Sequence, residues 1–281
     1  MTASMRLPYD LQRPAWTIEL PWRFREISGI APLTGDGAIG FVEDERVCVH
    51  EIDRDTGRIT RHHNHGKGDA EDLVVIDGSA YILCAGKRPH LLLMETYRHD
   101  PPGRLTRIDL DLDPTFDPEG LCPEPGGHRL LIACKGTPPG TGNERMRQIF
   151  AFELATHRRS SEPVLGIDTV QVTGEAGRFN PSALAVHPIS GDLYVIGSKG
   201  SKRLACWRAD GTFRGSWRLD RHLLPQPEGI AFSPCGELIL SSEGRSKKKS
   251  SKKSKATGKR RHAPRLCGFP LLYPTAGARE G

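Results

Sequence analysis

The residues best suited to chemistry in this chain are carboxylates and amides that recur in five short phrases. The phrases are EISGIA (26–31), DAEDLV (69–74), DPEGLC (117–122), NPSALA (180–185) and QPEGIA (226–231). One residue before the central, usually small position stand Ser28, Glu71, Glu119, Ser182 and Glu228. Three residues before it stand Glu26, Asp69, Asp117, Asn180 and Gln226. Oxygen-bearing side chains of this kind suit a hard divalent cation such as Ca²⁺, or a polar substrate pocket.

The five phrases mark a repeat that predicts a β-propeller. Their central positions, 29, 72, 120, 183 and 229, lie 43, 48, 63 and 46 residues apart. After each phrase come further short runs of β-forming residues, separated by turn signals such as ISGD (189–192). Four strands in a unit of about 45 residues are typical of a propeller blade. The long interval contains TPPGTGNERM (137–146), which we interpret as a loop insertion.

We therefore predict one all-β domain over residues 1–281, a five-bladed propeller with four-stranded antiparallel blades. The fifth unit is one strand short, and AWTIELP (15–21) precedes the first unit without a partner. An N-terminal strand that completes the last blade would close the ring and remove an open sheet edge. Six blades are the alternative, if the 63-residue interval holds one more.

The first strand of each propeller blade lines the central tunnel, so equivalent polar residues should gather at one tunnel mouth. Side chains alternate along a strand, which predicts two stacked polar rings with up to six carboxylates. Two carboxylates 4 Å apart repel by roughly 4 kcal/mol at intermediate dielectric. Second strands return to the same mouth, and near their ends stand Lys87, Lys135, Lys199 and Glu243. These lysines could neutralise part of the ring.

Three interpretations of the ring remain open. It could hold Ca²⁺ or another divalent cation, with Glu26, Glu71, Glu119, Asn180 and Glu228 as ligands. It could form a small-molecule substrate pocket, with Asp72, Lys87, Lys199 and Glu243 as binding residues. It could instead join blades through hydrogen bonds to neighbouring backbone amides. If the site is catalytic, the candidates are His65, Glu71 and Lys135.

A histidine-rich segment, HHNHGKGD (62–69), precedes the second phrase. His62, His63 and His65 could form a transition-metal site, or His65 could act as a general base because it lies nearest Glu71 in sequence. Adjacent side chains in an extended segment point apart, so an exposed loop with chance histidines is the competing interpretation.

Composition excludes several classes of protein. The seven cysteines are widely spaced without a CxxC, which indicates buried thiols in a reducing compartment rather than a disulfide frame or a zinc site. No apolar run is long enough for a membrane span, and the N-terminus lacks a secretory apolar stretch, so we expect a cytoplasmic protein.

One Lys/Ser-rich run dominates the net charge of +6. Residues 245–261 carry ten Lys or Arg and no acid, so the rest of the chain is mildly acidic. We expect a disordered insertion over 245–263. Weak, salt-sensitive polyanion binding through the run is the functional alternative.

In their motifs and their order, the five phrases resemble the SdiA-regulated family of bacterial β-propellers. The resemblance covers residues 24 to 244, and the basic insertion and Lys135 depart from the family pattern. That family is distantly similar to calcium-dependent lactonase and esterase propellers and to phytase-like propellers. The resemblance implies a metal-assisted hydrolase of the esterase, lactonase or phosphoester class. A non-catalytic propeller that binds a ligand or a protein is the alternative.

Overall fold

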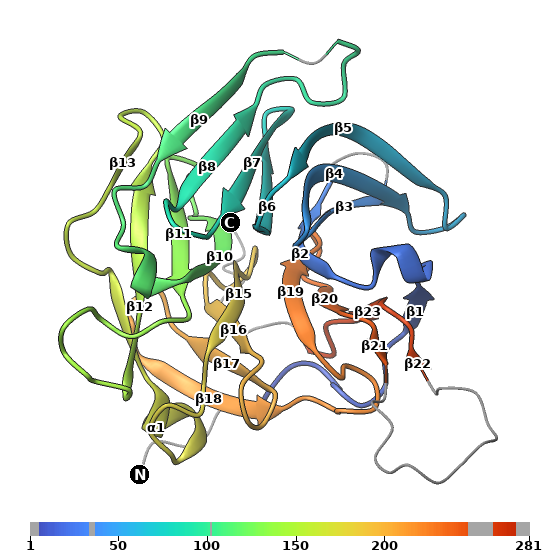
Figure 1. Cartoon of the computed structure of the whole chain (residues 1–281). Coiled ribbons are helices and arrows are strands. Elements are labelled where there is room, and N and C mark those ends of the chain that lie inside the picture. The colour runs from blue at the N-terminus through green and yellow to red at the C-terminus, as the bar shows by residue number, and fades with distance from the viewer. Residues whose placement is uncertain (1–5, 34–36, 102, 247–260, 274–281) are drawn as a thin grey trace, which may run out of the picture.

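The computed structural model describes residues 6–33, 37–101, 103–246 and 261–273, apart from the side chains of 62, 63, 246 and 261. The chain forms five antiparallel sheets arranged as blades around a central axis (Figure 1). The five-bladed propeller predicted from the repeat is thereby confirmed. Helical structure in the described residues is limited to two 3-10 turns, Trp22–Phe24 and Pro114–Phe116, and one short helix, α1 (Thr169–Thr173).

Each blade begins with the strand that carries one of the five phrases. Blade 1 consists of β2 (Ile27–Pro32), β3 (Ala38–Glu43), β4 (Arg46–Asp53) and β5 (Ile59–Lys67). Blade 2 consists of β6 (Ala70–Ile76), β7 (Ser79–Cys84), β8 (His90–Met94) and β9 (Leu105–Asp109). Blade 4 consists of β15 (Pro181–Val186), β16 (Leu193–Gly197), β17 (Arg203–Trp207) and β18 (Phe213–Arg218).

Blade 3 accounts for the long sequence interval without a sixth blade. It consists of β10 (Pro118–Pro123), β11 (Arg129–Cys134), β12 (Met146–Glu153), β13 (Arg158–Arg159) and β14 (Leu165–Asp168). Both β13 and β14 pair with β12, so the outer strand is split in two. The additional residues form the loop between β11 and β12, together with the segment around α1.

The N-terminal strand closes the ring, as the sequence predicts. Blade 5 consists of β19 (Pro227–Phe232), β20 (Leu238–Ser242), β23 (Arg265–Phe269) and β1 (Trp16–Glu19). β1 pairs with β23 in the register Trp16↔Gly268 to Glu19↔Arg265. The basic insertion leaves this blade through the short pair β21 (Arg245–Ser246) and β22 (Arg261–His262). Most of the run, residues 247–260, lies outside the described residues, so its predicted disorder stays a prediction.

Apolar residues fill the space between neighbouring blades. Five clusters of buried side chains lie at the five successive blade interfaces. The inner strands also meet on the axis, where their later residues line an apolar cavity of about 150 Å³ that includes Leu73, Leu121 and Phe232. The tunnel is therefore apolar toward this end, and the polar residues of the five phrases lie at the other.

The inner strands share a β-bulge at the repeated polar residue. In every blade the register with the second strand shifts across this point, for example between Ala70 and Asp72 or between Pro118 and Gly120. A bulge leaves one residue outside the ladder and re-aims its side chain. The simple alternation used to predict two stacked rings is thus interrupted at this residue in all five blades.

The inner strands pack very closely, and this explains the repeated glycine. A methyl group at Gly29 would lie 2.3 Å from the Cα of Asp72 in the next blade. One at Gly120 would lie 3.0 Å from the Cα of Ala183, and one at Gly229 would lie 2.7 Å from the carbonyl oxygen of Ser28. Glycine stands at these positions because neighbouring backbones leave no room for a side chain.

Short polar side chains join blades across these contacts. Ser28 Oγ donates to the Glu71 carbonyl (2.6 Å), and Ser182 Oγ donates to the Pro227 carbonyl (3.1 Å). Ser241 Oγ donates to the Ser28 carbonyl at 3.0 Å. Hydrogen bonds of the kind considered as a structural explanation of the ring are therefore present, but serines make these three.

Asp72 forms a fourth link and has both oxygens engaged. Its carboxylate accepts from the backbone N–H of Leu73 at 2.8 Å and from that of Leu121 in blade 3 at 2.7 Å. The side chain is buried, and burial raises its pKa while the two amides oppose that rise. These contacts give Asp72 a role in joining blades 2 and 3, and its role in substrate binding stays a prediction.

Two further observations concern the cysteines and the helices of the described residues. Among the described residues all seven cysteines are free thiols, and six of them are buried. No helix in the described ranges is long and apolar enough to cross a membrane.

Replacing Asp72 by Asn should destabilise the propeller, because one backbone N–H would face an amide NH₂ instead of an oxygen. We expect the free energy of unfolding to fall by roughly 1–3 kcal/mol, the scale of one unsatisfied buried donor, in urea titrations. Asp55→Asn, at an exposed residue between β4 and β5, is the control and should not destabilise the fold. If D72N unfolds like wild type, the proposed role of Asp72 in joining the blades is wrong.

Candidate functional site: the acidic tunnel mouth

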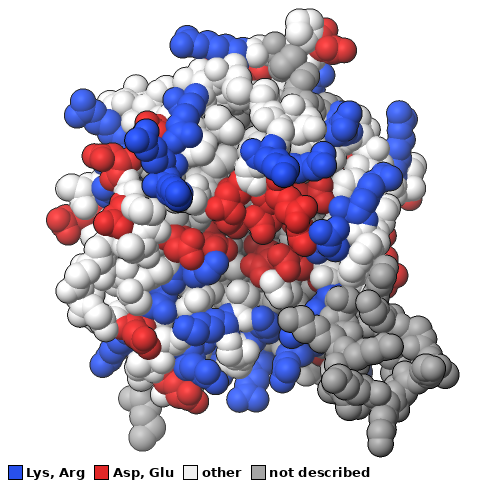
Figure 2. All heavy atoms as spheres, in the orientation of Figure 1, with Lys and Arg blue, Asp and Glu red and all other residues white. Residues whose placement is uncertain are grey.

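Acidic side chains gather at the centre of one face, where the inner strands begin. Figure 2 shows Asp and Glu side chains clustered in the middle of this face and Lys and Arg side chains arranged around them. This region is called the acidic mouth below. Its charged members are Asp44, Asp69, Glu71, Asp117, Glu119, Lys135, Lys202, Glu228 and Glu243.

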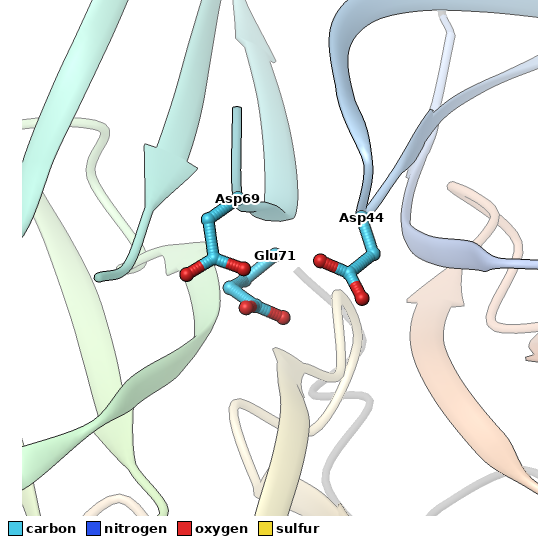
Figure 3. Close-up of side chains that lie close together, drawn as sticks. All are labelled: Asp44, Asp69 and Glu71. Carbon is cyan, nitrogen blue, oxygen red and sulfur yellow. The ribbon is translucent and has the colours of Figure 1, made fainter. Parts of the chain in front are cut away.

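Three carboxylates from blades 1 and 2 converge on a common point. Asp44 lies in the turn between β3 and β4, Asp69 immediately precedes β6, and Glu71 is the bulged residue of β6. One oxygen of each lies within 4.8 Å of the others. Figure 3 shows the three carboxyl groups directed toward one another. Together they form the described part of the mouth best arranged to hold a cation.

Burial and repulsion from neighbouring acids raise the pKa of two of these carboxyl groups, Asp44 and Glu71. Burial raises the pKa of Asp44 to about 6, and a hydrogen bond to Asp69 with the charges of Asp69 and Glu26 adds to the shift. Burial raises the pKa of Glu71 to about 10, assisted by the charges of Glu119, Asp44 and Asp69. Near neutral pH the group must therefore retain protons or gain a positive charge from elsewhere.

A third set of equivalent positions completes the mouth. Just after each second strand, one backbone N–H donates to the carbonyl of the residue that begins a phrase, as in Asp44 to Glu26 and Lys135 to Asp117. The five residues that donate in this way are Asp44, Ala85, Lys135, Ser198 and Glu243. The predicted lysines at 87 and 199 lie one or two residues beyond this position.

The lysines predicted at the mouth therefore divide into two groups. Lys135 occupies the equivalent position and reaches the ring. Lys87 and Lys199 are exposed, and Lys87 lines a separate cavity of about 410 Å³ with Asp109 and Asp111. Their role in substrate binding stays a prediction, now without support from a position inside the mouth.

Lys135 neutralises the blade 3 side of the mouth. Its Nζ donates to the Glu119 carboxylate and lies 3.4 Å from Asp117 Oδ2. Burial opposes the charge on Lys135, but Glu119, Asp117 and Glu71 outweigh it and raise the lysine pKa. Burial raises the pKa of Glu119 to about 7, with Lys135 lowering it. This pair is the internal neutralisation that the sequence suggests.

Two further glutamates face the mouth from blade 5. Burial raises the pKa of Glu228 to about 7, while Lys202 and Lys135 lower it. Burial and the charges of Glu228 and Asp44 raise the pKa of Glu243 to about 8. Both groups are thus poised to exchange a proton near neutral pH.

Glu26 and Asn180, the remaining predicted metal ligands, have protein partners. Glu26 Oε1 lies 3.1 Å from Arg25 Nη2, and Glu26 lines a side pocket of about 560 Å³ with His50 and Arg46. Asn180 Oδ1 accepts from Nη2 of the buried Arg147 at 3.0 Å. Of the five predicted ligands, Glu71 alone belongs to the converging trio.

His65 lies in β5, the outer strand of blade 1, and its side chain is exposed. The trio at the mouth forms without it. The side chains of His62 and His63 are outside the described residues. A catalytic role for His65 stays a prediction, and the ring carboxylates are the nearer candidates for proton transfer.

Sequence reasoning missed Asp44, Lys202 and Arg147. The signal for Asp44 is present in FVEDE (41–45), which ends the second strand of blade 1 as SSEG does in blade 5. Lys202 lies four residues beyond the equivalent Ser198, whose carbonyl accepts a hydrogen bond from its Nζ. Arg147 is on the third strand of blade 3, and its contact with Asn180 depends on tertiary packing.

No family model and no curated protein matches the chain. The family resemblance proposed from the five phrases therefore has no independent support from these comparisons. Solved structures do match, at sequence identities low enough that they establish the fold alone.

One such structure is a luciferin-regenerating enzyme, with TM-score 0.52 and 11% identity, covering 88% of this chain and 92% of that one. Another is a provisionally named gluconolactonase, with TM-score 0.50 and 16% identity over 80% of this chain and 74% of that one. A third comes from a nidogen/laminin complex, with TM-score 0.51 and 13% identity over 77% and 72%. The chain is similar in fold both to enzymes and to a member of a protein complex.

Proposed function

We propose that the acidic mouth binds a hard divalent cation, Ca²⁺ in the first instance, and that the protein is a metal-assisted hydrolase of the esterase, lactonase or phosphoester class. The observation that carries the proposal is the convergence of Asp44, Asp69 and Glu71 within 4.8 Å. Oxygen ligands lie about 2.4 Å from Ca²⁺, so two of them on opposite sides of the ion are about 4.8 Å apart. The trio fits that span.

The electrostatics of the trio point in the same direction. The pKa values of Asp44 and Glu71 are raised above their ordinary range because both carboxyl groups are partly buried beside other acids. Lys135, the cation that pairs with the blade 3 carboxylates, is directed to Glu119 and Asp117. A cation bound by the trio would offset the remaining repulsion between blades 1 and 2.

A bound Ca²⁺ would supply Lewis-acid polarisation of a substrate carbonyl or phosphoryl oxygen. We assign the proton transfer to Glu228, because its pKa of about 7 suits a general base at neutral pH. Glu119 and Asp117 are less suited to that role because both carboxylates are paired with Lys135. Glu243, whose pKa is raised to about 8, is the second carboxylate available to the substrate.

The fold neighbours and the family resemblance agree with this proposal without carrying it. A luciferin-regenerating enzyme and a provisionally named gluconolactonase share the architecture. The ordered phrases remain our reason for proposing a relation to SdiA-regulated propellers. Fold alone does not transfer function, so the site must carry the argument.

A non-catalytic binding propeller is the second candidate. The observation that favours it is the pairing of Lys135 with Glu119, which neutralises part of the ring without any ligand. The two candidates differ in whether the mouth turns over a substrate.

Ca²⁺ should bind to the wild-type protein, and Glu71→Gln should weaken that binding by about tenfold or more, because one charged ligand is lost. Isothermal titration calorimetry measures both affinities. Glu162→Gln removes the same charge from an exposed residue of blade 3 and should leave the affinity unchanged. Equal affinities in the two variants would contradict the trio as the metal site.

The calcium-free protein should lose stability as pH rises. A carboxyl group whose pKa is raised by folding stabilises the folded state while protonated, and this contribution disappears as pH rises through the raised pKa. Stability should fall between the ordinary pKa and the raised pKa of each group, which are 3.8 and about 6 for Asp44 and 4.5 and about 8 for Glu243. We expect the melting temperature to fall between about pH 5 and pH 8 in chelator and Ca²⁺ to restore it. A melting temperature that rises over this range would argue against the assigned repulsion.

Glu228→Gln should lower kcat by about 10² to 10⁴, the usual contribution of a general base, while Ca²⁺ affinity stays within a few-fold of wild type. Suitable substrates are p-nitrophenyl acetate, a γ-lactone and bis(p-nitrophenyl) phosphate, each assayed with Ca²⁺ and with chelator. Glu162→Gln again serves as the control. Calcium binding without turnover of any substrate class would favour the binding propeller.

A further inference from the structure

A basic pocket opens beside the acidic mouth, between blades 4 and 5. Its volume is about 1250 Å³, and it is lined by Gln12 and by residues of the β16–β17 turn, the end of β18, the β18–β19 loop and the β21–β22 pair. Its cationic side chains are Lys202, Arg218, Arg221 and Arg245. Pockets that bind small molecules commonly measure about 300–1,000 Å³, so this one has room for more than a single inorganic anion.

The arginines of the basic pocket have no counter-ion among the residues that the structure describes. Arg218, Arg221 and Arg245 form no ion pair with any described residue. The lining contains one carboxylate, Asp220, and its Oδ1 accepts the backbone N–H of His222 at 2.7 Å. The pocket therefore has a surplus of positive charge that an anionic ligand would offset.

Lys202 connects the basic pocket to the acidic mouth. Its half-buried Nζ donates to the Ser198 carbonyl, which belongs to the equivalent set at the mouth. Burial lowers the pKa of Lys202, Glu228 and Glu243 oppose this shift, and Arg245 and Arg221 add to it. The lysine thus feels the mouth carboxylates on one side and the pocket arginines on the other.

The chain also passes directly from one site to the other. Pro225 lines the pocket, Gln226 follows it at the start of the fifth phrase, and Glu228 is the bulged residue of β19. The pocket and the mouth are therefore neighbours along this segment of the chain.

We infer that the basic pocket binds a phosphate group of a small-molecule ligand, whose remainder reaches the acidic mouth. Guanidinium groups pair with phosphate through two parallel hydrogen bonds, and three arginines line the pocket. That this ligand is the substrate rests on the proposed hydrolase function, whereas the phosphate site itself does not.

The test is calorimetric titration with phenyl phosphate and with inorganic pyrophosphate in calcium-free buffer. Arg218→Ala combined with Arg221→Ala should weaken binding by about tenfold or more, through loss of charge-assisted hydrogen bonds. The control combines Arg158→Ala with Arg208→Ala, which removes the same charge from exposed residues outside the pocket and should change the affinity by less than about twofold. Both double variants retain the basic run at 247–260, so its contribution cancels.

Thermal melting checks that each variant is folded, and Arg221→Glu is a second variant because it alters only an exposed loop residue. Equal weakening in the two double variants, or no binding by wild type, would overturn the phosphate site. Calcium titration of the same proteins separates the two proposals. Phosphate binding that depends on Arg218 and Arg221, without calcium binding, would retain the pocket and refute the metal site. Calcium binding alone would do the reverse.

Discussion

The close approach of five inner strands around one axis is the constraint on which the rest of this structure depends. At Gly29, Gly120 and Gly229 the next blade stands so near that a methyl group would collide with it. The strand bulges at the preceding residue, and that residue leaves the ladder at the tunnel mouth. The close approach accounts for these three glycines, and the bulge accounts for the position of the polar residue that precedes each of them.

Placing acids at the bulge creates an electrostatic problem that the molecule solves differently around the ring. In blade 3 Lys135 pairs with Glu119 and Asp117. Lys202, in the β16–β17 turn of blade 4, partly offsets the charge of Glu228 in blade 5. Between blades 1 and 2, Asp44, Asp69 and Glu71 face one another, and the pKa of Glu71 is raised to about 10. The ring is thus fivefold in backbone but asymmetric in charge, and this asymmetry selects the place where a cation would bind.

The sequence was sufficient for the architecture because the repeat encodes it in several independent ways. Phrase spacing predicted five blades, and the strand missing from the last unit predicted closure by the N-terminal segment. The site was less predictable because it depends on the bulge and on tertiary neighbours. Alternation along an ideal strand could not separate Ser28, which turns to a neighbouring carbonyl, from Glu71, which joins the trio.

The positions of the lysines were harder to predict from the sequence than those of the glutamates. Strand ends were predicted from composition, and an offset of one or two residues moves a side chain out of the mouth. Lys135 stands at the residue whose N–H bonds to the start of its phrase, whereas Lys87 and Lys199 lie just past it and are exposed. Asp44 occupies that residue in blade 1, and the same rule applied to FVEDE would have found it.

The serines at the bulge provide an internal comparison for the glutamates. Ser28 and Ser182 stand at the same structural position as Glu71, Glu119 and Glu228, and each donates a hydrogen bond to the next blade. A serine therefore satisfies what the fold requires at this position. A glutamate adds a buried charge whose removal from water costs several kcal/mol unless it is compensated. Glutamates at three of the five positions exceed the needs of the propeller, and their excess charge is the physical reason to assign the mouth a ligand.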